Sequence, residues 1–96
     1  MPLHTFVRFE PAPGKAQQLH DELLRVVTAT RTEPGCLRIH LFRSIREPLA
    51  FVIHSEWIDE AAFDAHSQFP HMQLFLALVP ELINHPIQAV CTLQID

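Results

Sequence analysis

The stretch from Cys36 to Trp57, "CLRIHLFRSIREPLAFVIHSEW", decides the fold because it contains two alternating segments joined by a turn. In the first segment we expect Leu37, Ile39 and Leu41 on one face, and Arg38, His40 and Phe42 on the other. The turn "IREP" then returns the chain as "LAFVIHSEW". This pattern predicts a β-hairpin.

The segments on either side of the hairpin predict the remaining elements. Before it, "LHTFVRFE" at 3–10 has strand composition and is stopped by "PAPG", and apolar residues recur at helical spacing over 15–31. After it, Asp59 can cap a short helix through Ser67, a second helical run begins at Pro70, and 87–95 read as a final strand. The order βαββαβ predicts a single α+β domain over 1–96, a ferredoxin-like antiparallel sheet with helices on one side.

The sheet face away from the helices is expected to be partly buried as well. Both faces of the first and third strands carry apolar residues, such as Phe6 opposite Val7 and Val52 beside Phe51. A second copy of the same sheet is the predicted cover, which makes the protein a homodimer. His54 and Glu56 point toward that partner, either in a hydrogen-bond network or as solvated charges.

Composition excludes several classes of partner. The 96 residues carry a net charge of −4 without a cluster of Lys or Arg, which argues against nucleic acid. The first residues do not resemble a signal peptide, and no apolar run is long enough to cross a membrane. Cys36 and Cys91 form no CxxC pair, so we expect reduced thiols in a cytoplasmic protein.

The seven histidines raise the question of a metal site. His66 and His71 are separated by five positions and a proline, without the i, i+4 spacing or a carboxylate–histidine motif, so we expect no metal. His4, His20 and His85 are expected to be solvated or loop residues.

His66 and Trp57 are the candidates for chemistry. Phe63 lies three positions before His66, which places this histidine on the apolar side of its short helix, near a C-terminus that favours the charged form. His66 is therefore either a buried, hydrogen-bonded residue or a proton acceptor. Trp57 is either a core residue or one wall of an aromatic pocket with Phe63 and Phe75.

Three motifs occur in a characteristic order: "TEPGCL", "SEWIDEAAFDAH" and "PHM". Their order and spacing resemble the antibiotic biosynthesis monooxygenase (ABM) domain family, small dimeric α+β barrels that include quinol monooxygenases. The resemblance implies a homodimer with a pocket between sheet and helices in each protomer. It also implies oxidation of a quinol-like or polycyclic phenolic substrate by molecular oxygen, with no bound cofactor.

On this resemblance, His66 and Trp57 are the predicted catalytic residues. The predicted substrate-binding residues are Ile53, Phe63, His71 and Phe75. Polyketide-oxidising members carry polar Asn and Tyr residues at the positions of Ile53 and Phe63, and this chain lacks both.

Other relatives define the alternatives. Haem-degrading members need a His near the position of Leu76 and an Asn at that of Thr5 or Phe6, so haem is not expected. An isomerase of a small phosphorylated ketone would need a cationic cradle, for which Arg8, Arg38 and Arg43 are the candidates. A dimeric small-molecule-binding protein without turnover is the third possibility.

Overall fold

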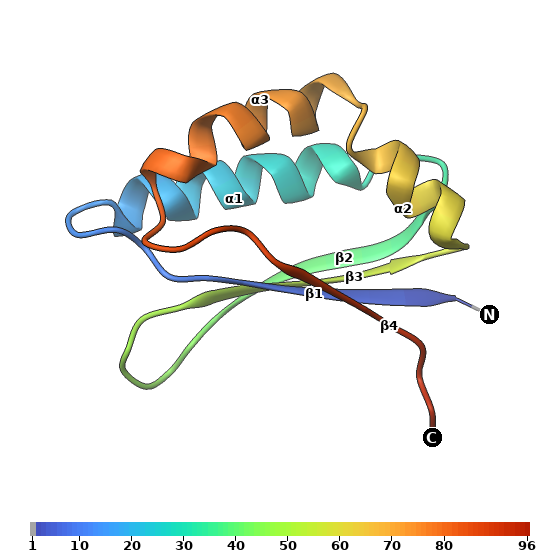
Figure 1. Cartoon of the computed structure of the whole chain (residues 1–96), viewed down its shortest axis with the longest axis horizontal. Helices are drawn as coiled ribbons and strands as arrows, with labels where there is room; N and C mark the ends of the chain where they lie inside the picture. The colour runs from blue at the N-terminus through green and yellow to red at the C-terminus, as the bar shows by residue number, and fades with distance from the viewer. Residues whose placement is uncertain (1) are drawn as a thin grey trace.

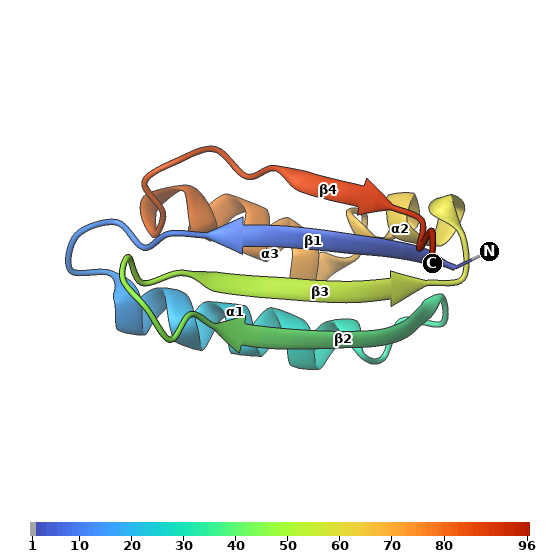
Figure 2. The ribbon, with the colours of Figure 1, turned by 90° about the horizontal axis from the view of Figure 1, so that it is seen from below.

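The predicted hairpin forms one side of the sheet in the structure, a computed structural model that describes residues 2–96. Strands β2 (Cys36–Arg43) and β3 (Phe51–Trp57) pair antiparallel. Strand β1 (Leu3–Phe9) pairs with the other edge of β3, and β4 (Ala89–Thr92) pairs with β1. The sheet order β2-β3-β1-β4 is antiparallel throughout and confirms the ferredoxin-like α+β arrangement (Figure 2).

All helices lie on one face of this sheet (Figure 1). They are α1 (Ala16–Thr30), α2 (Glu60–His66) and α3 (Pro70–Leu78), followed by the short 3-10 helix η1 (Val79–Glu81). The side chain of Asp59 accepts a hydrogen bond from the Ala62 N–H and caps α2, as predicted. Pro70 occupies the first turn of α3, where its missing N–H leaves no helical bond unmade.

The core lies between the helices and the sheet. The buried face of α1 is the one predicted from its spacing, formed by Leu19, Leu23, Val26, Val27 and Thr30. It packs with residues of the sheet and of α3, where the rings of Phe9 and Phe75 meet edge to face at 6.0 Å. Burial of these side chains is the main stabilising term of the fold.

One residue of the hairpin lies on the unexpected face. Leu37 is 50% exposed, whereas Ile39 is buried. The pairing of β2 with β3 shifts between Cys36 and Arg38, as at a β-bulge. A bulge adds one residue to a strand and interrupts the alternation of its faces, so the predicted position of Leu37 beside Ile39 is wrong.

The sheet face away from the helices is open and carries apolar groups. Phe6, Phe42 and Val90 are 42%, 54% and 59% exposed there. Figure 2 shows this face toward the viewer, with the helices behind the strands. A partner sheet as its cover remains a prediction at this point.

The two cysteines lie on opposite edges of the sheet. Cys36 begins edge strand β2 and Cys91 lies in edge strand β4, and both are free thiols. This separation explains why they do not form a disulfide. Within residues 2–96, none of the helices combines the length and apolar character needed to span a bilayer.

Candidate functional site

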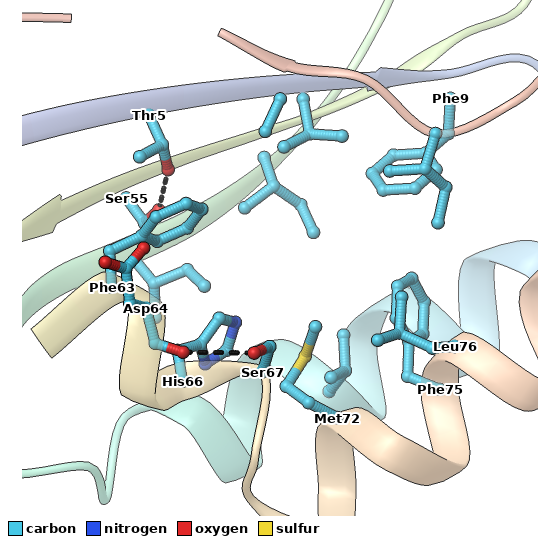
Figure 3. A pocket seen from close by; sticks show the side chains of 16 residues that line it. Thr5, Phe9, Ser55, Phe63, Asp64, His66, Ser67, Met72, Phe75 and Leu76 are labelled. Atoms are coloured by element: carbon cyan, nitrogen blue, oxygen red, sulfur yellow. Dashed lines mark hydrogen bonds between the residues drawn. The ribbon is translucent and has the colours of Figure 1, made fainter. Parts of the chain in front are cut away.

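A cavity of about 370 Å³ lies between the sheet and the helices (Figure 3). Most of its lining is apolar: Val7, Phe9, Val26, Ile39, Ile53, Phe63, Met72, Phe75, Leu76, Ile87 and Ala89. Five polar residues complete it: Thr5, Ser55, Asp64, His66 and Ser67. A mostly apolar cavity with a few convergent polar groups is the usual form of a small-molecule site.

Thr5, Ser55 and His66 lie toward one end of the cavity, which Phe63 also lines. Figure 3 shows Thr5 and Ser55 on the strands, across from His66 on α2. Phe9 and Phe75 lie at the other end. This division suits a ligand that has an apolar ring system and a polar group at one side.

His66 is held by a residue that the sequence did not assign to the site. Its Nδ1 lies 2.7 Å from Oε2 of Glu33, and Nε2 of His71 lies 2.7 Å from the same oxygen. Glu33 comes from the connection between α1 and β2, and its side chain is only 2% exposed. An ionised carboxylate only accepts hydrogen bonds, so each ring donates an N–H to it.

The hydrogen bond to Glu33 defines the tautomer of His66. With the proton on Nδ1, the Nε2 of a neutral ring carries a free lone pair. Nε2 makes no hydrogen bond to any of residues 2–96, and His66 lines the cavity. The site therefore presents an oriented proton acceptor to whatever occupies the cavity.

Burial keeps this acceptor neutral. Desolvation lowers the pKa of His66 below its usual value of 6.5, and the charge of His71 acts in the same direction. Glu33 raises that pKa through its hydrogen bond and its charge, but desolvation and His71 together outweigh it. The C-terminus of α2 favours the charged form of His66, as the sequence indicates, whereas burial favours the neutral form.

Trp57 lies behind the cavity wall and does not line it. The indole is fully buried, and its Nε1–H donates to Ser55 Oγ at 2.9 Å. Its ring is tilted against that of His66, with centroids 4.7 Å apart. Trp57 thus contacts Ser55 and His66, two of the polar residues of the cavity, from the side away from the cavity.

Of the other predicted site residues, three line the cavity and one does not. Ile53, Phe63 and Phe75 line the cavity, whereas His71 contacts Glu33 from outside the lining. Ile53 and Phe63, which stand where Asn and Tyr were described above for polyketide-oxidising proteins, make the cavity wall apolar at both positions.

Glu33, His66 and His71 also form a group that could hold a metal ion, with ligand atoms within 4.8 Å of one another. No carboxylate–histidine motif in the sequence announces this group, because Glu33 reaches the two histidines from a distant turn. Both ring nitrogens converge on a single carboxylate oxygen at 2.7 Å, the length of a charge-assisted N–H bond. The arrangement is that of a carboxylate accepting two imidazole protons.

Two histidines predicted to be solvated or loop residues have structural partners. His4 Nδ1 lies 2.9 Å from His54 Nε2 on the open face of the sheet. His85 lies in a loop, as expected, but its Nε2 accepts the Glu10 N–H at 2.9 Å. His20 remains near the surface beside Asp21.

Two of the three arginines considered as a phosphate cradle form ion pairs, and none of the three lines the cavity. Arg8 pairs with Glu10 at 2.9 Å, and Arg38 with Glu56 at 3.1 Å. The lining residues include neither Lys nor Arg. The cavity therefore offers no fixed positive charge to a phosphate group.

Residues 2–78 match the family model "Antibiotic biosynthesis monooxygenase" (ABM). The chain belongs to this family. It is 31% identical to the Bacillus subtilis protein named "Putative monooxygenase YcnE" over 90 residues, which cover 94% of this chain and 93% of that one.

Solved structures of similar proteins have the same fold. The structure of Rv0793 from Mycobacterium tuberculosis superposes with a TM-score of 0.93 at 28% identity, covering 100% of this chain and 97% of the other. A crystal structure described as an antibiotic biosynthesis monooxygenase superposes with a TM-score of 0.89 at 26% identity, covering 98% and 99%. The cavity and its histidine thus lie within a fold typical of the family.

Proposed function

We propose that this protein is a monooxygenase that oxidises a quinol-like or polycyclic phenolic small molecule with molecular oxygen and without a cofactor. The observation that carries the proposal is the neutral His66, oriented by buried Glu33 and directed into an apolar cavity. Membership of the ABM family and the names of the relatives support the reaction class.

In the proposed mechanism, His66 Nε2 removes the proton of a substrate hydroxyl group. The resulting anion is electron-rich and gives up electrons to oxygen far more readily than the neutral phenol does. The surrounding apolar wall excludes water from the reacting anion, and a neutral imidazole is able to take up the proton in this step.

The reaction balances without an added reductant. For a naphthohydroquinone, one oxygen atom of O₂ enters the ring as a new hydroxyl group, and the product is a hydroxynaphthoquinone. The other oxygen atom leaves as water with two hydrogens of the substrate. The substrate thus provides all the electrons.

The protein is further proposed to act as a homodimer joined through the open sheet face. Support comes from the exposed Phe6, Phe42 and Val90 on that face, and from the family, whose proteins are typically dimeric. The Arg38–Glu56 and His4–His54 pairs would lie in or beside the interface. Such a dimer covers apolar area that a monomer would leave in water.

The test is oxygen uptake with 1,4-naphthohydroquinone in the presence of a chelator, corrected for the uncatalysed rate. Incorporation of ¹⁸O from ¹⁸O₂ into the product separates a monooxygenase from an oxidase that makes peroxide. His66→Gln keeps a hydrogen-bonding side chain but cannot take up a proton at neutral pH, so uptake should fall by roughly 10²-fold or more. The variant should melt within a few degrees of the wild type.

His71→Gln is the matched control, because His71 bonds the same Glu33 oxygen from outside the cavity. It should retain most of the activity. Equal losses in the two variants would show that disturbance of Glu33 is responsible, and that His66 is not the base. No oxygen uptake by the wild type, with ligand binding intact, would favour the small-molecule-binding alternative.

A further inference from the structure

We propose that the hydroxyl groups of Thr5 and Ser55, backed by Trp57, form a hydrogen-bond donor that recognises an acceptor oxygen of the ligand. The inference deepens the proposed function, on which it rests, because it names the ligand atom that the polar end of the cavity selects. That atom is a carbonyl or phenolate oxygen on an otherwise apolar ring.

The two hydroxyl groups are placed by the pairing of two central strands. Thr5 of β1 lies directly opposite Ser55 of β3, and both side chains point toward the helices and line the cavity. Both residues are almost completely buried, at 1% and 3% exposure. Thr5 Oγ1 and Ser55 Oγ are hydrogen-bonded to each other.

One of the two hydroxyl protons of this pair has no acceptor. The indole Nε1–H of Trp57 can only donate, and it donates to Ser55 Oγ. Between the two hydroxyls, one proton makes the Thr5–Ser55 bond. Whichever group donates, the other keeps an O–H proton for which residues 2–96 provide no acceptor.

Because the two hydroxyl groups are buried, the proton without an acceptor affects which ligand atoms can bind beside them. A buried donor without an acceptor is unfavourable, so a ligand oxygen that accepts the proton is favoured over a hydrogen atom at the same place. The donation from Trp57 polarises Ser55 and strengthens the chain of hydrogen bonds. The chain lies across the cavity from His66, so a ligand between them can accept a hydrogen bond on one side and face His66 on the other (Figure 3).

Ser67 shows that not every hydroxyl in the lining is of this kind. It also lines the cavity, but its proton is donated to the backbone oxygen of Asp64 at 3.0 Å. Ser67 therefore has no proton left for a ligand. It is a natural control for the Thr5–Ser55 pair.

The experiment compares 1-tetralone with tetralin, which has the same two rings but no carbonyl group. Neither ligand requires turnover, and a ketone accepts hydrogen bonds without donating any. Dissociation constants are measured by equilibrium dialysis at pH 8, where His66 is neutral and cannot donate from Nε2. The quantity compared is the ratio of the tetralin constant to the tetralone constant, which cancels effects of the variants on general apolar binding.

The double variant Thr5→Val, Ser55→Ala should lower this ratio by about fivefold relative to the wild type, the scale of one hydrogen bond. Ser67→Ala should leave the ratio within about twofold. An unchanged ratio in the double variant, or an equal drop in Ser67→Ala, would overturn the inference.

A second measurement on the wild type covers the case in which the double variant does not fold. The infrared carbonyl band of bound 1-tetralone should lie at lower wavenumber than in an apolar solvent. A band at the apolar position would overturn the inference. Failure of oxygen uptake would instead refute the proposed reaction and leave these binding results unaffected.

Discussion

Replacement of Glu33 by glutamine tests whether His66 is neutral in the native protein. The carboxylate accepts bonds from His66 Nδ1 and His71 Nε2, and an amide oxygen in the same place can accept both. The other oxygen, Oε1, is already buried without a partner, so the NH₂ group of glutamine exchanges one unpaired buried polar group for another. Glu33→Gln thus removes the charge and preserves the hydrogen bonds.

The two charge states of His66 predict very different costs for this change. With a neutral His66, the loss of a buried carboxylate charge should change stability by no more than about 1 kcal/mol, or roughly 5 °C in the melting temperature of a domain of this size. With a protonated His66, the variant would bury an unpaired cation, at a cost of about 3–5 kcal/mol. That loss corresponds to a fall of roughly 15 °C or more.

Glu33→Ala provides the comparison, because it removes the acceptor altogether. His66 Nδ1–H would be left buried without a partner, whereas His71, with 16% of its side chain exposed, could turn toward water. The expected loss is about 2 kcal/mol, or roughly 10 °C.

The assay is thermal unfolding at pH 8, together with NMR titration of the His66 ring. The expected order of melting temperatures is wild type, then Glu33→Gln close behind, then Glu33→Ala. The pKa of His66 should be lower in Glu33→Gln than in the wild type, since the carboxylate raises it. A glutamine variant that melts below the alanine variant would refute the neutral base, and with it the proposed mechanism.

Three further predictions concern stability at low pH, the proposed dimer, and the close contact between Gly35 and Ala62. Because the native pKa of His66 is lowered, the unfolded chain binds its proton first as the pH falls, so stability measured by urea unfolding should decrease below about pH 6.5. Val52→Asp places a carboxylate on the open sheet face. An unpaired charge buried there should weaken dimerisation by several kcal/mol, so the variant should sediment as a monomer in analytical ultracentrifugation. A wild type that is monomeric at micromolar concentration would contradict the sheet-to-sheet model. Gly35→Ala should lower the melting temperature, since the added Cβ would overlap Ala62 of α2, and an unchanged melting curve would show that α2 can move.

Much of the fold could be predicted from local pattern. The alternation from Cys36 to Trp57, the helical spacing of the α1 face and the cap at Asp59 each depend on residues close together in the chain. The exposed position of Leu37 could not be predicted in this way. The bulge beside it arises from the pairing register of two strands, and the alternation of apolar residues does not reveal it.

The candidate site was predictable only in part. His66 was recognised because its neighbours place it on the apolar side of a short helix, and it does line the cavity. Glu33 stands in the "TEPGCL" motif, but nothing in its immediate surroundings in the sequence indicates that it is buried. The sequence does not single out Thr5 and Ser55, because small hydroxyl residues are common in strands.

The sequence by itself determined the order of elements, the family resemblance and the presence of a histidine against an apolar helix face, because these depend on periodicity and short motifs. Only the tertiary structure decided what that histidine does. Folding brings Glu33 across 33 positions to His66 Nδ1, and it places the Trp57 indole behind Ser55 rather than in the cavity. Hydrogen bonds between distant residues set the tautomer, and burial sets the charge, and neither can be deduced from spacing along the chain.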